Sequence, residues 1–250
     1  MSPKIILITG ASGGIGAALA RAYAAAGVTL ILWGRDQARL DQTVAACRAQ
    51  GAACVTDMPD VRDFAAVTAR LTARDGETPV DLAIFNAGLG GMAPDDAPAE
   101  VPDSARAVAE VNFVSPIVGA SVMAGLMARR GRGRIVLMGS ISESFPLPMA
   151  PTYAATKAGL AMFAEALSIR LAPRGVAVTL VSPGFIDTAM SRKVTQPKPF
   201  LMDADAAARI IRRRIDAGAR RIVVPWQFAV IRAAARLLPR AVVRRVLARA

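Results

Sequence analysis

The chain contains no histidine in its 250 residues, few aromatic residues and only two cysteines. Without histidine it cannot build a Ser-His-Asp or Cys-His hydrolase, and nearly all zinc chemistry is excluded. Proton transfer at neutral pH must therefore fall to a carboxylate, a lysine or a tyrosine with a shifted pKa. Cys47 lies in a helical pattern and Cys54 in a strand pattern, so we expect buried, reduced thiols rather than a disulfide or a metal site.

Long runs made up only of apolar residues are also absent, which argues against a membrane-spanning helix. The first residues, Met1 to Lys4, lead into a strand-like run without the small-residue cleavage site of a signal peptide. We therefore expect a cytoplasmic protein. Hydrophobic residues make up 54% of the chain, which is enough for the buried core of a large α/β domain.

Short apolar runs alternate with longer segments of helical period, which is typical of repeated β-α units and a parallel sheet. Strands are predicted at residues 4–9, 28–33, 52–57, 80–86, 134–139, 176–182 and 220–225. Helices are predicted at residues 14–26, 36–50, 61–74, 101–129, 152–172 and 204–217. With right-handed crossovers, this order predicts an α/β fold with a doubly wound, Rossmann-like, seven-stranded parallel sheet and helices on both faces. We expect a dinucleotide-binding catalytic domain over 1–225 and a basic amphipathic C-terminal tail over 226–250.

The first predicted strand ends in a glycine-rich turn, TGASGGIG at residues 9–16, and a helix follows at once. Such a turn lets the backbone approach a pyrophosphate and points the free N–H groups of the helix at it. The spacing is G-x-x-x-G-x-G rather than the commoner G-x-G-x-x-G. We expect the turn to bind the cofactor through Gly10, Ser12, Gly13, Gly14, Ile15 and Gly16.

The second predicted strand ends in Trp33-Gly34-Arg35-Asp36. In dinucleotide-binding folds an acidic residue here hydrogen-bonds the ribose 2′-hydroxyl, whereas a nearby arginine accommodates a 2′-phosphate. Gly34 stands at the expected acidic position with Arg35 beside it, and Asp36 fits a helix N-cap. These residues favour NADP(H), and NAD(H) remains the alternative.

Tyr153 and Lys157 stand at positions i and i+4 of one predicted helix, and therefore on the same face. A neighbouring ammonium favours the phenolate and lowers the pKa of a tyrosine towards neutrality. By itself the Y-x-x-x-K spacing is a weak motif that occurs by chance on many helices. Its value comes from the other motifs of the chain.

Taken together, these motifs resemble the short-chain dehydrogenase/reductase family, in its single-domain form of about this length. The resemblance covers residues 4–190. Besides the glycine-rich turn and the Tyr153/Lys157 pair, it depends on Asp57, Asn86-Ala87-Gly88, Asn112, Ser140, and Pro183-Gly184 before Thr188.

The resemblance implies a catalytic role for each of four residues. Tyr153 would donate the proton in reduction, and Ser140 would hydrogen-bond the substrate oxygen. Lys157 would hold the nicotinamide ribose and tune Tyr153, and Asn112 would anchor a water that links Lys157 to solvent.

For the cofactor, the resemblance implies that Asp57 meets the adenine edge and that other positions line the channel or border the nicotinamide. These positions are Met58, Asn86, Ala87, Gly88, Pro183, Gly184, Ile186 and Thr188. Two positions depart from the family pattern. Met58-Pro59 follows Asp57 where a β-branched residue is more common, and Gly13 stands where many NADP(H)-preferring relatives carry a basic residue.

Apolar side chains surround the expected mouth of the site, as they do in pockets for apolar ligands and also on the undersides of ordinary loops. They are Phe145, Leu147, Met149, Phe185, Met190, Phe200 and Met202. Of these we assign Phe145, Met149, Phe185 and Met190, together with Ser142, to substrate binding. The expected substrate is a hydrophobic carbonyl compound or alcohol.

Positive charge is concentrated at the end of the chain. Residues 1–190 hold 16 basic and 16 acidic residues, whereas residues 191–250 hold 15 and 3. The tail alternates apolar stripes with arginines, which fits packing on the protein itself or on a second copy, or contact with an anionic membrane interface. Nucleic-acid binding is not expected, because the tail has no reading element and no interleaved aromatics.

These patterns predict an NADP(H)-dependent carbonyl reductase or alcohol dehydrogenase. The family implies a homodimer or homotetramer that pairs through the helices at 101–129 and 152–172. A dinucleotide-binding sensor or scaffold without turnover is the alternative from another class. The presence of Ser140, Tyr153 and Lys157 together counts against it, since binding alone does not require all three.

Overall fold

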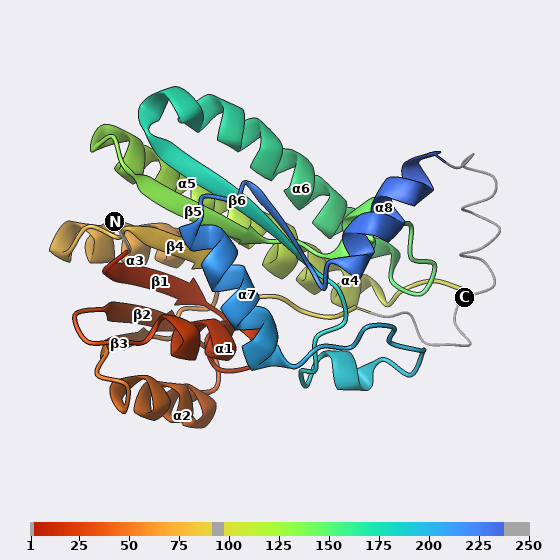
Figure 1. Ribbon diagram of the computed structural model, residues 1–250, viewed down its shortest axis with the longest axis horizontal. Helices are drawn as coiled ribbons and strands as arrows, with labels where there is room; N and C mark the ends of the chain where they lie inside the picture. The colour runs from red at the N-terminus through yellow and green to blue at the C-terminus, as the bar shows by residue number, and fades with distance from the viewer. Residues whose placement is uncertain (1–2, 92–97, 238–250) are drawn as a thin grey trace.

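The computed structural model describes residues 3–91 and 98–237, which form a seven-stranded parallel sheet covered by helices (Figure 1). The strand order is β3-β2-β1-β4-β5-β6-β7. The strands are β1 (Ile5–Thr9), β2 (Thr29–Trp33), β3 (Ala53–Asp57), β4 (Leu82–Phe85), β5 (Gly133–Met138), β6 (Val176–Pro183) and β7 (Arg221–Val224). The predicted doubly wound fold is confirmed.

The α-helices of the described residues are α1 (Gly14–Tyr23), α2 (Gln37–Arg48), α3 (Phe64–Glu77), α4 (Pro102–Ala109), α5 (Ser115–Arg129), α6 (Pro151–Leu171), α7 (Ala204–Asp216) and α8 (Gln227–Leu237). Shorter helical segments are η1 (Glu110–Val114), η2 (Ile141–Ser144), η3 (Ala172–Arg174) and η4 (Ser191–Lys193).

The strands are apolar on both faces because helices cover both faces of a parallel sheet. In β1, Ile6 and Ile8 belong to a core cluster shared with α1, α2 and α7. Leu7, between them, belongs to a second cluster shared with α3, α5 and α6. Alternate residues of one strand therefore enter different cores, as the two-residue period of a strand requires.

The sheet reverses its direction of winding between β1 and β4, which are neighbours in the sheet although two strands separate them in the sequence. In open α/β sheets, ligands bind outside the carboxyl ends of the strands at this switch point. The glycine-rich turn follows β1 and Asn86 follows β4, so both lie at that edge.

The helix predicted at 101–129 is interrupted by one π-helical turn, η1, which the sequence pattern did not predict. The whole run Pro102–Arg129 is long and apolar enough to cross a membrane by length and composition alone, which differs from our expectation. Half of its most apolar window is buried inside the structure. Core helices of folded domains pass the same test, so the finding is weak evidence for a membrane span.

Both cysteines are free: Cys47 is buried and Cys54 is partly buried. Burial and the neighbouring Cys54 raise the pKa of the Cys47 thiol to about 12. A thiol with so high a pKa stays protonated and unreactive at neutral pH.

The described part of the tail packs on the body of the protein through its inner face. Phe228 of α8 is 6% exposed and meets the rings of Phe185 and Phe200 edge to face. Trp226, just before α8, and Val230, on α8, are 69% and 57% exposed. The remainder of the predicted tail, residues 238–250, lies outside the described residues.

Candidate active site

The turn after β1 is too tight for side chains at two of its glycines. Gly10 has a φ of 72°, and a Cβ on Gly16 would lie 2.2 Å from the carbonyl oxygen of Gly10. A Cβ on Gly13, by contrast, would meet nothing within 4 Å, and its φ of 176° suits any residue. This close approach forms the cradle that a pyrophosphate needs at the N-terminus of α1.

Thr9 and Asn86 connect the turn to the end of β4. The hydroxyl of Thr9 accepts hydrogen bonds from the backbone N–H groups of Asn86 and Ala87, each at 3.0 Å. In return, the side-chain amide of Asn86 donates to the carbonyl of Thr9 at 3.1 Å and to that of Gly10 at 3.4 Å. Asn86 therefore supports the cradle from behind.

At the end of β2, Gly34 is buried and packs against the turn. A Cβ on Gly34 would lie 3.0 Å from Cβ of Ser12 and 3.2 Å from a methyl of Leu40. The acidic residue that recognises a ribose 2′-hydroxyl therefore has no room here unless Ser12 moves. Asp36 caps α2 by accepting a hydrogen bond from the N–H of Arg39, as predicted.

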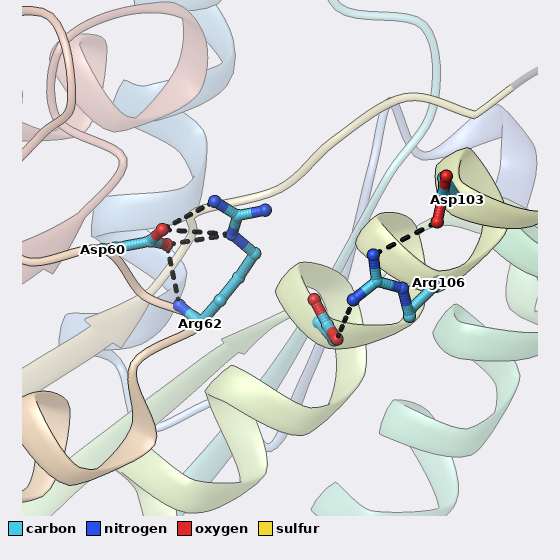
Figure 2. A network of polar contacts seen from close by, with 5 residues as sticks. Asp60, Arg62, Asp103 and Arg106 are labelled. Carbon is cyan, nitrogen blue, oxygen red and sulfur yellow. Dashed lines mark hydrogen bonds and ion pairs between the residues drawn. The ribbon is translucent and has the colours of Figure 1, made fainter.

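Arg35 is exposed beside this position and makes no hydrogen bond or ion pair with a described residue. Its charge acts on the nearby Asp60. Hydrogen bonds from Arg62 lower the pKa of Asp60 to about 2, and Figure 2 shows this pair together with Arg106 of α4. Arg106 in turn pairs with Asp103 and with Glu110.

Asp57, expected at the adenine edge, is already engaged within the protein. Its carboxylate accepts two hydrogen bonds from Arg74, at 2.9 and 3.0 Å, and one from the indole N–H of Trp33 at 3.2 Å. The sequence did not point to Arg74, because it lies on α3 and only the fold brings it to the end of β3. Met58, which follows, is 46% exposed.

Ser140, Tyr153 and Lys157 come together at the carboxyl end of β5. Ser140 begins η2 directly after β5 and is 8% exposed. Burial raises the pKa of the Tyr153 phenol above its usual value, and a side-chain hydrogen bond with Ser140 acts in the opposite direction. The ammonium of Lys157 lies 5.7 Å from the centre of the Tyr153 ring. The structure therefore brings these three residues together, and their catalytic roles stay a prediction.

Lys157 is 5% exposed and donates a hydrogen bond to the carbonyl of Met138 at 2.8 Å. Burial lowers the pKa of Lys157 to about 8, and the charge of Glu143 acts in the opposite direction. At pH 7 the side chain is thus still mostly an ammonium, next to the phenol.

Asn112 is completely buried in the π-helical turn η1, a feature frequent at functional sites. Its side-chain amide accepts from the N–H of Leu89 at 2.7 Å and donates to the carbonyl of Leu89 at 2.8 Å. Both ends of the amide hold the segment after β4, in which a Cβ on Gly88 would lie 3.3 Å from Oδ1 of Asn112. The side chain thus fixes the channel wall.

The segment after β6 forms the opposite wall. The backbone N–H of Gly184 donates to the carbonyl of Val224 at 2.7 Å, and Ile186 bridges to Met202. Thr188 reaches the glycine-rich turn, since a Cβ on Gly14 would lie 3.2 Å from its methyl. Pro183, the last residue of β6, is buried.

The residues assigned to substrate binding lie in two segments, one after β5 and one after β6. Phe145 and Met149 are partly buried after η2, and Met190 is 42% exposed and lies against Gly90. Phe185 packs on Phe228 of α8. The hydroxyl of Ser142 is buried without a hydrogen-bond partner among the described residues.

Two carboxylates near the triad were missed from the sequence. Glu100 accepts hydrogen bonds from the N–H and the hydroxyl of Thr152, and so caps the helix that carries Tyr153. Glu143 is buried three residues after Ser140. The signal that could have identified Glu143 was its position three residues after Ser140, in a segment that the fold covers.

This geometry is that of a dinucleotide-binding oxidoreductase. The family model for short chain dehydrogenases matches residues 4–199, and the chain belongs to this family. It is an NAD(P)-dependent dehydrogenase/reductase.

Three known proteins illustrate what this chain is similar to. A putative ketoacyl reductase of monensin polyketide synthesis from Streptomyces virginiae is 35% identical over 77% of this chain and 74% of the relative. A short-chain dehydrogenase from Sphingobium yanoikuyae, solved with NADPH, has a TM-score of 0.81 and 26% identity over 95% and 97% of the two chains. A bulky-bulky ketone specific alcohol dehydrogenase from Comamonas testosteroni has a TM-score of 0.78 and 26% identity over 95% and 96%.

The steric difference between Gly16 and Gly13 generates a prediction. Gly16→Ala places a methyl group against backbone, which must shift, so we expect NADPH affinity to fall by about tenfold or more. Gly13→Ala is the matched control, and we expect it to bind within about twofold of the wild type. Isothermal titration calorimetry with NADPH measures both, and equal affinities would contradict the proposed cradle.

Proposed function

We propose that the protein reduces a carbonyl to an alcohol, or catalyses the reverse reaction, with NADP(H) as cofactor and Tyr153 as acid/base. The observation that carries the proposal is the approach of Lys157 to Tyr153, with the ammonium 5.7 Å from the centre of the ring, at the end of β5 that Ser140 follows. These three groups lie at the same edge of the sheet as the glycine cradle. When bound, the nicotinamide supplies or accepts the hydride.

The side chains divide the remaining work. Tyr153 is protonated at neutral pH because burial raises its pKa, so its phenol can donate a proton to the developing alkoxide. Ser140 offers a second hydrogen bond to the same oxygen. Lys157 then stabilises the phenolate that is left, since its ammonium persists below about pH 8. Arg35 would hold the 2′-phosphate.

We propose a hydrophobic substrate. Phe145, Met149 and Met190 support this assignment by their apolar character, as do the ketoacyl reductase and the bulky-ketone dehydrogenase among the similar proteins. Turnover of small polar aldehydes and ketones alone would contradict it.

The central test is Tyr153→Phe. Loss of the phenolic proton should lower kcat by about 10²- to 10⁴-fold, the usual range for a general acid, while NADPH affinity stays within about twofold. Consumption of NADPH with a panel of aryl, aliphatic and small polar ketones measures turnover, and calorimetry measures binding. Unchanged turnover would remove Tyr153 from the mechanism. Cofactor binding without any turnover by the wild type would favour a dinucleotide-binding sensor.

The cofactor preference has its own test in Arg35→Glu. A carboxylate here should weaken NADPH binding by about 10- to 100-fold through loss of a charge-assisted contact, and leave NADH binding unchanged. Arg39→Glu is the control, because Arg39 is a nearby exposed arginine that pairs with Asp36. If Arg35→Glu leaves the ratio of the two affinities unchanged, the protein has no preference that depends on this residue.

Two exposed apolar surfaces support different partners. On α6, Met162 and Ile169 are 69% and 71% exposed, and we propose that this face pairs two copies of the chain. At the start of α8, Trp226 and Val230 are exposed beside the basic tail, and we propose that this face touches an anionic membrane surface from the cytoplasm.

One experiment separates the two surfaces, with each double variant as the control of the other. Met162→Ser/Ile169→Ser should lower the mass in light scattering and still sediment with liposomes that contain phosphatidylserine. Trp226→Ser/Val230→Ser should keep the mass and lose sedimentation. Failure of the wild type to sediment would rule out the membrane contact, and a monomeric wild type would rule out the pairing.

A further inference from the structure

The side chain of Glu143, in η2, is 2% exposed and sits at the meeting point of four elements. Its carboxylate accepts a hydrogen bond from the hydroxyl of Ser182 of β6, at 2.9 Å to Oε1 and 3.0 Å to Oε2. It pairs closely with Arg221 of β7, and Arg232 of α8 lies 3.6 Å from Oε1. One buried charge thus joins four segments, of which η2 and β6 are far in sequence from β7 and α8.

Such a cluster is a poor source of stability. Burying a carboxylate and two guanidinium groups is costly, and apolar side chains of similar volume often stabilise a fold as well or better. The cluster instead fixes the relative positions of the segments it joins, because hydrogen bonds and ion pairs are geometrically specific whereas apolar contacts are not.

The segments that Glu143 joins are the two walls of the active site. On one side, Glu143 lies one short turn from Ser140, and a Cβ on Gly139 would lie 2.8 Å from its Oε2. On the other side, Ser182 directly precedes Pro183 and Gly184, which border the expected nicotinamide position. The carboxylate of Glu143 therefore sets the distance between Ser140 and the opposite wall of the site.

Helix α8 contacts the same two walls of the site. Arg232 reaches Glu143, and the ring of Phe228 lies against Gly184, where a Cβ would come within 2.4 Å of it. The helix is thus connected to both sides of the site through independent contacts, one ionic and one apolar.

We propose that Glu143 is a positioning residue for the reaction, which holds the Ser140 segment against the end of β6 and couples both to α8 through Arg221 and Arg232. This inference rests on the proposed function for its kinetic test only. The groups that face Glu143 are the two arginines and Ser182, with the charge of Lys157 acting at longer range.

Glu143→Gln removes the charge and keeps the length of the side chain. We expect kcat to fall by about 10- to 100-fold, the effect of a misplacement on the order of 1 Å, while NADPH affinity stays within about twofold. Reduction of 2,2,2-trifluoroacetophenone, an electron-poor aryl ketone, is the assay. Asp41→Asn is the matched control: the same carboxylate-to-amide exchange on an exposed residue of α2, expected to leave kcat unchanged.

Arg232→Met tests the connection to α8 in a milder way, because Arg221 still neutralises Glu143. We expect a smaller loss of kcat than in Glu143→Gln and recovery in Arg232→Lys, which restores the charge. If the melting curve of Glu143→Gln shows that this variant does not fold, the comparison of Arg232→Met with Arg232→Lys tests the proposal instead. Wild-type kcat in both Glu143→Gln and Arg232→Met overturns the proposal, as does equal loss in Arg232→Met and Arg232→Lys.

A readout that needs no substrate uses the fact that the chain has only two tyrosines. The Tyr23→Phe variant leaves Tyr153 as the only tyrosine and so assigns its ¹³Cζ signal in the NADP⁺ complex. Displacement of Ser140 removes the contact that lowers the pKa of Tyr153, so this pKa should rise in Glu143→Gln and not in Asp41→Asn. A raised pKa in a protein that reduces no ketone would sustain the positioning role and refute the proposed function. An unmoved pKa in an active Glu143→Gln variant would refute the positioning role alone.

Discussion

The hydroxyl of Thr9 and the side-chain amide of Asn86 join the carboxyl ends of β1 and β4, and the cofactor side of the site depends on that junction. It brings the backbone of Gly10 so close to Gly16 and Asn86 that no Cβ fits between them. The turn can then present backbone N–H groups rather than side chains to a ligand. Because β1 and β4 flank the switch point of the sheet, the same junction places the glycine cradle beside the segment that Asn112 holds.

Features that depend on local pattern were predictable from the sequence. The strands follow from short apolar runs, and the N-cap at Asp36 follows from a polar residue before a helical period. The Tyr153/Lys157 pair follows from helical spacing, and Ser140 from the order of motifs. The strands, the N-cap and the Tyr153/Lys157 spacing require information from only a few neighbouring residues, which is why the fold was accessible, whereas Ser140 needed the order of motifs along the chain.

The partners that complete the site were not predictable, because they come from distant segments. Arg74 reaches Asp57 from the following helix, and Arg221 and Arg232 reach Glu143 across about 80 residues or more. A residue pattern cannot show which of many arginines faces a given carboxylate. The π-helical turn at Asn112 escaped for another reason: its apolar residues keep a period close to that of an α-helix.

The positive charges after residue 190 therefore lie in two different surroundings. Composition alone suggests a surface charge for a partner, but Arg221 and Arg232 point inward to a buried carboxylate. Part of the positive charge after residue 190 thus holds the active site together. The start of α8 instead exposes Trp226 and Val230, so the apolar side of this helix is shared between the body of the protein and the solvent.

The burial of Lys157 lowers the stability of the folded protein. Burial lowers its pKa from 10.5 to about 8, so below pH 8 the folded protein carries an ammonium that would be better hydrated in the unfolded chain. The sign follows from proton binding: between about pH 8 and pH 10.5 the unfolded state holds the extra proton, so stability rises with pH in that window. At neutral pH the full penalty is present, about 3 kcal/mol for a shift of this size. An apolar residue would avoid it, but only a buried cation next to Tyr153 can stabilise a phenolate without competition from water. The penalty and the proposed proton-transfer chemistry have the same physical origin, which is the burial of Lys157 next to Tyr153.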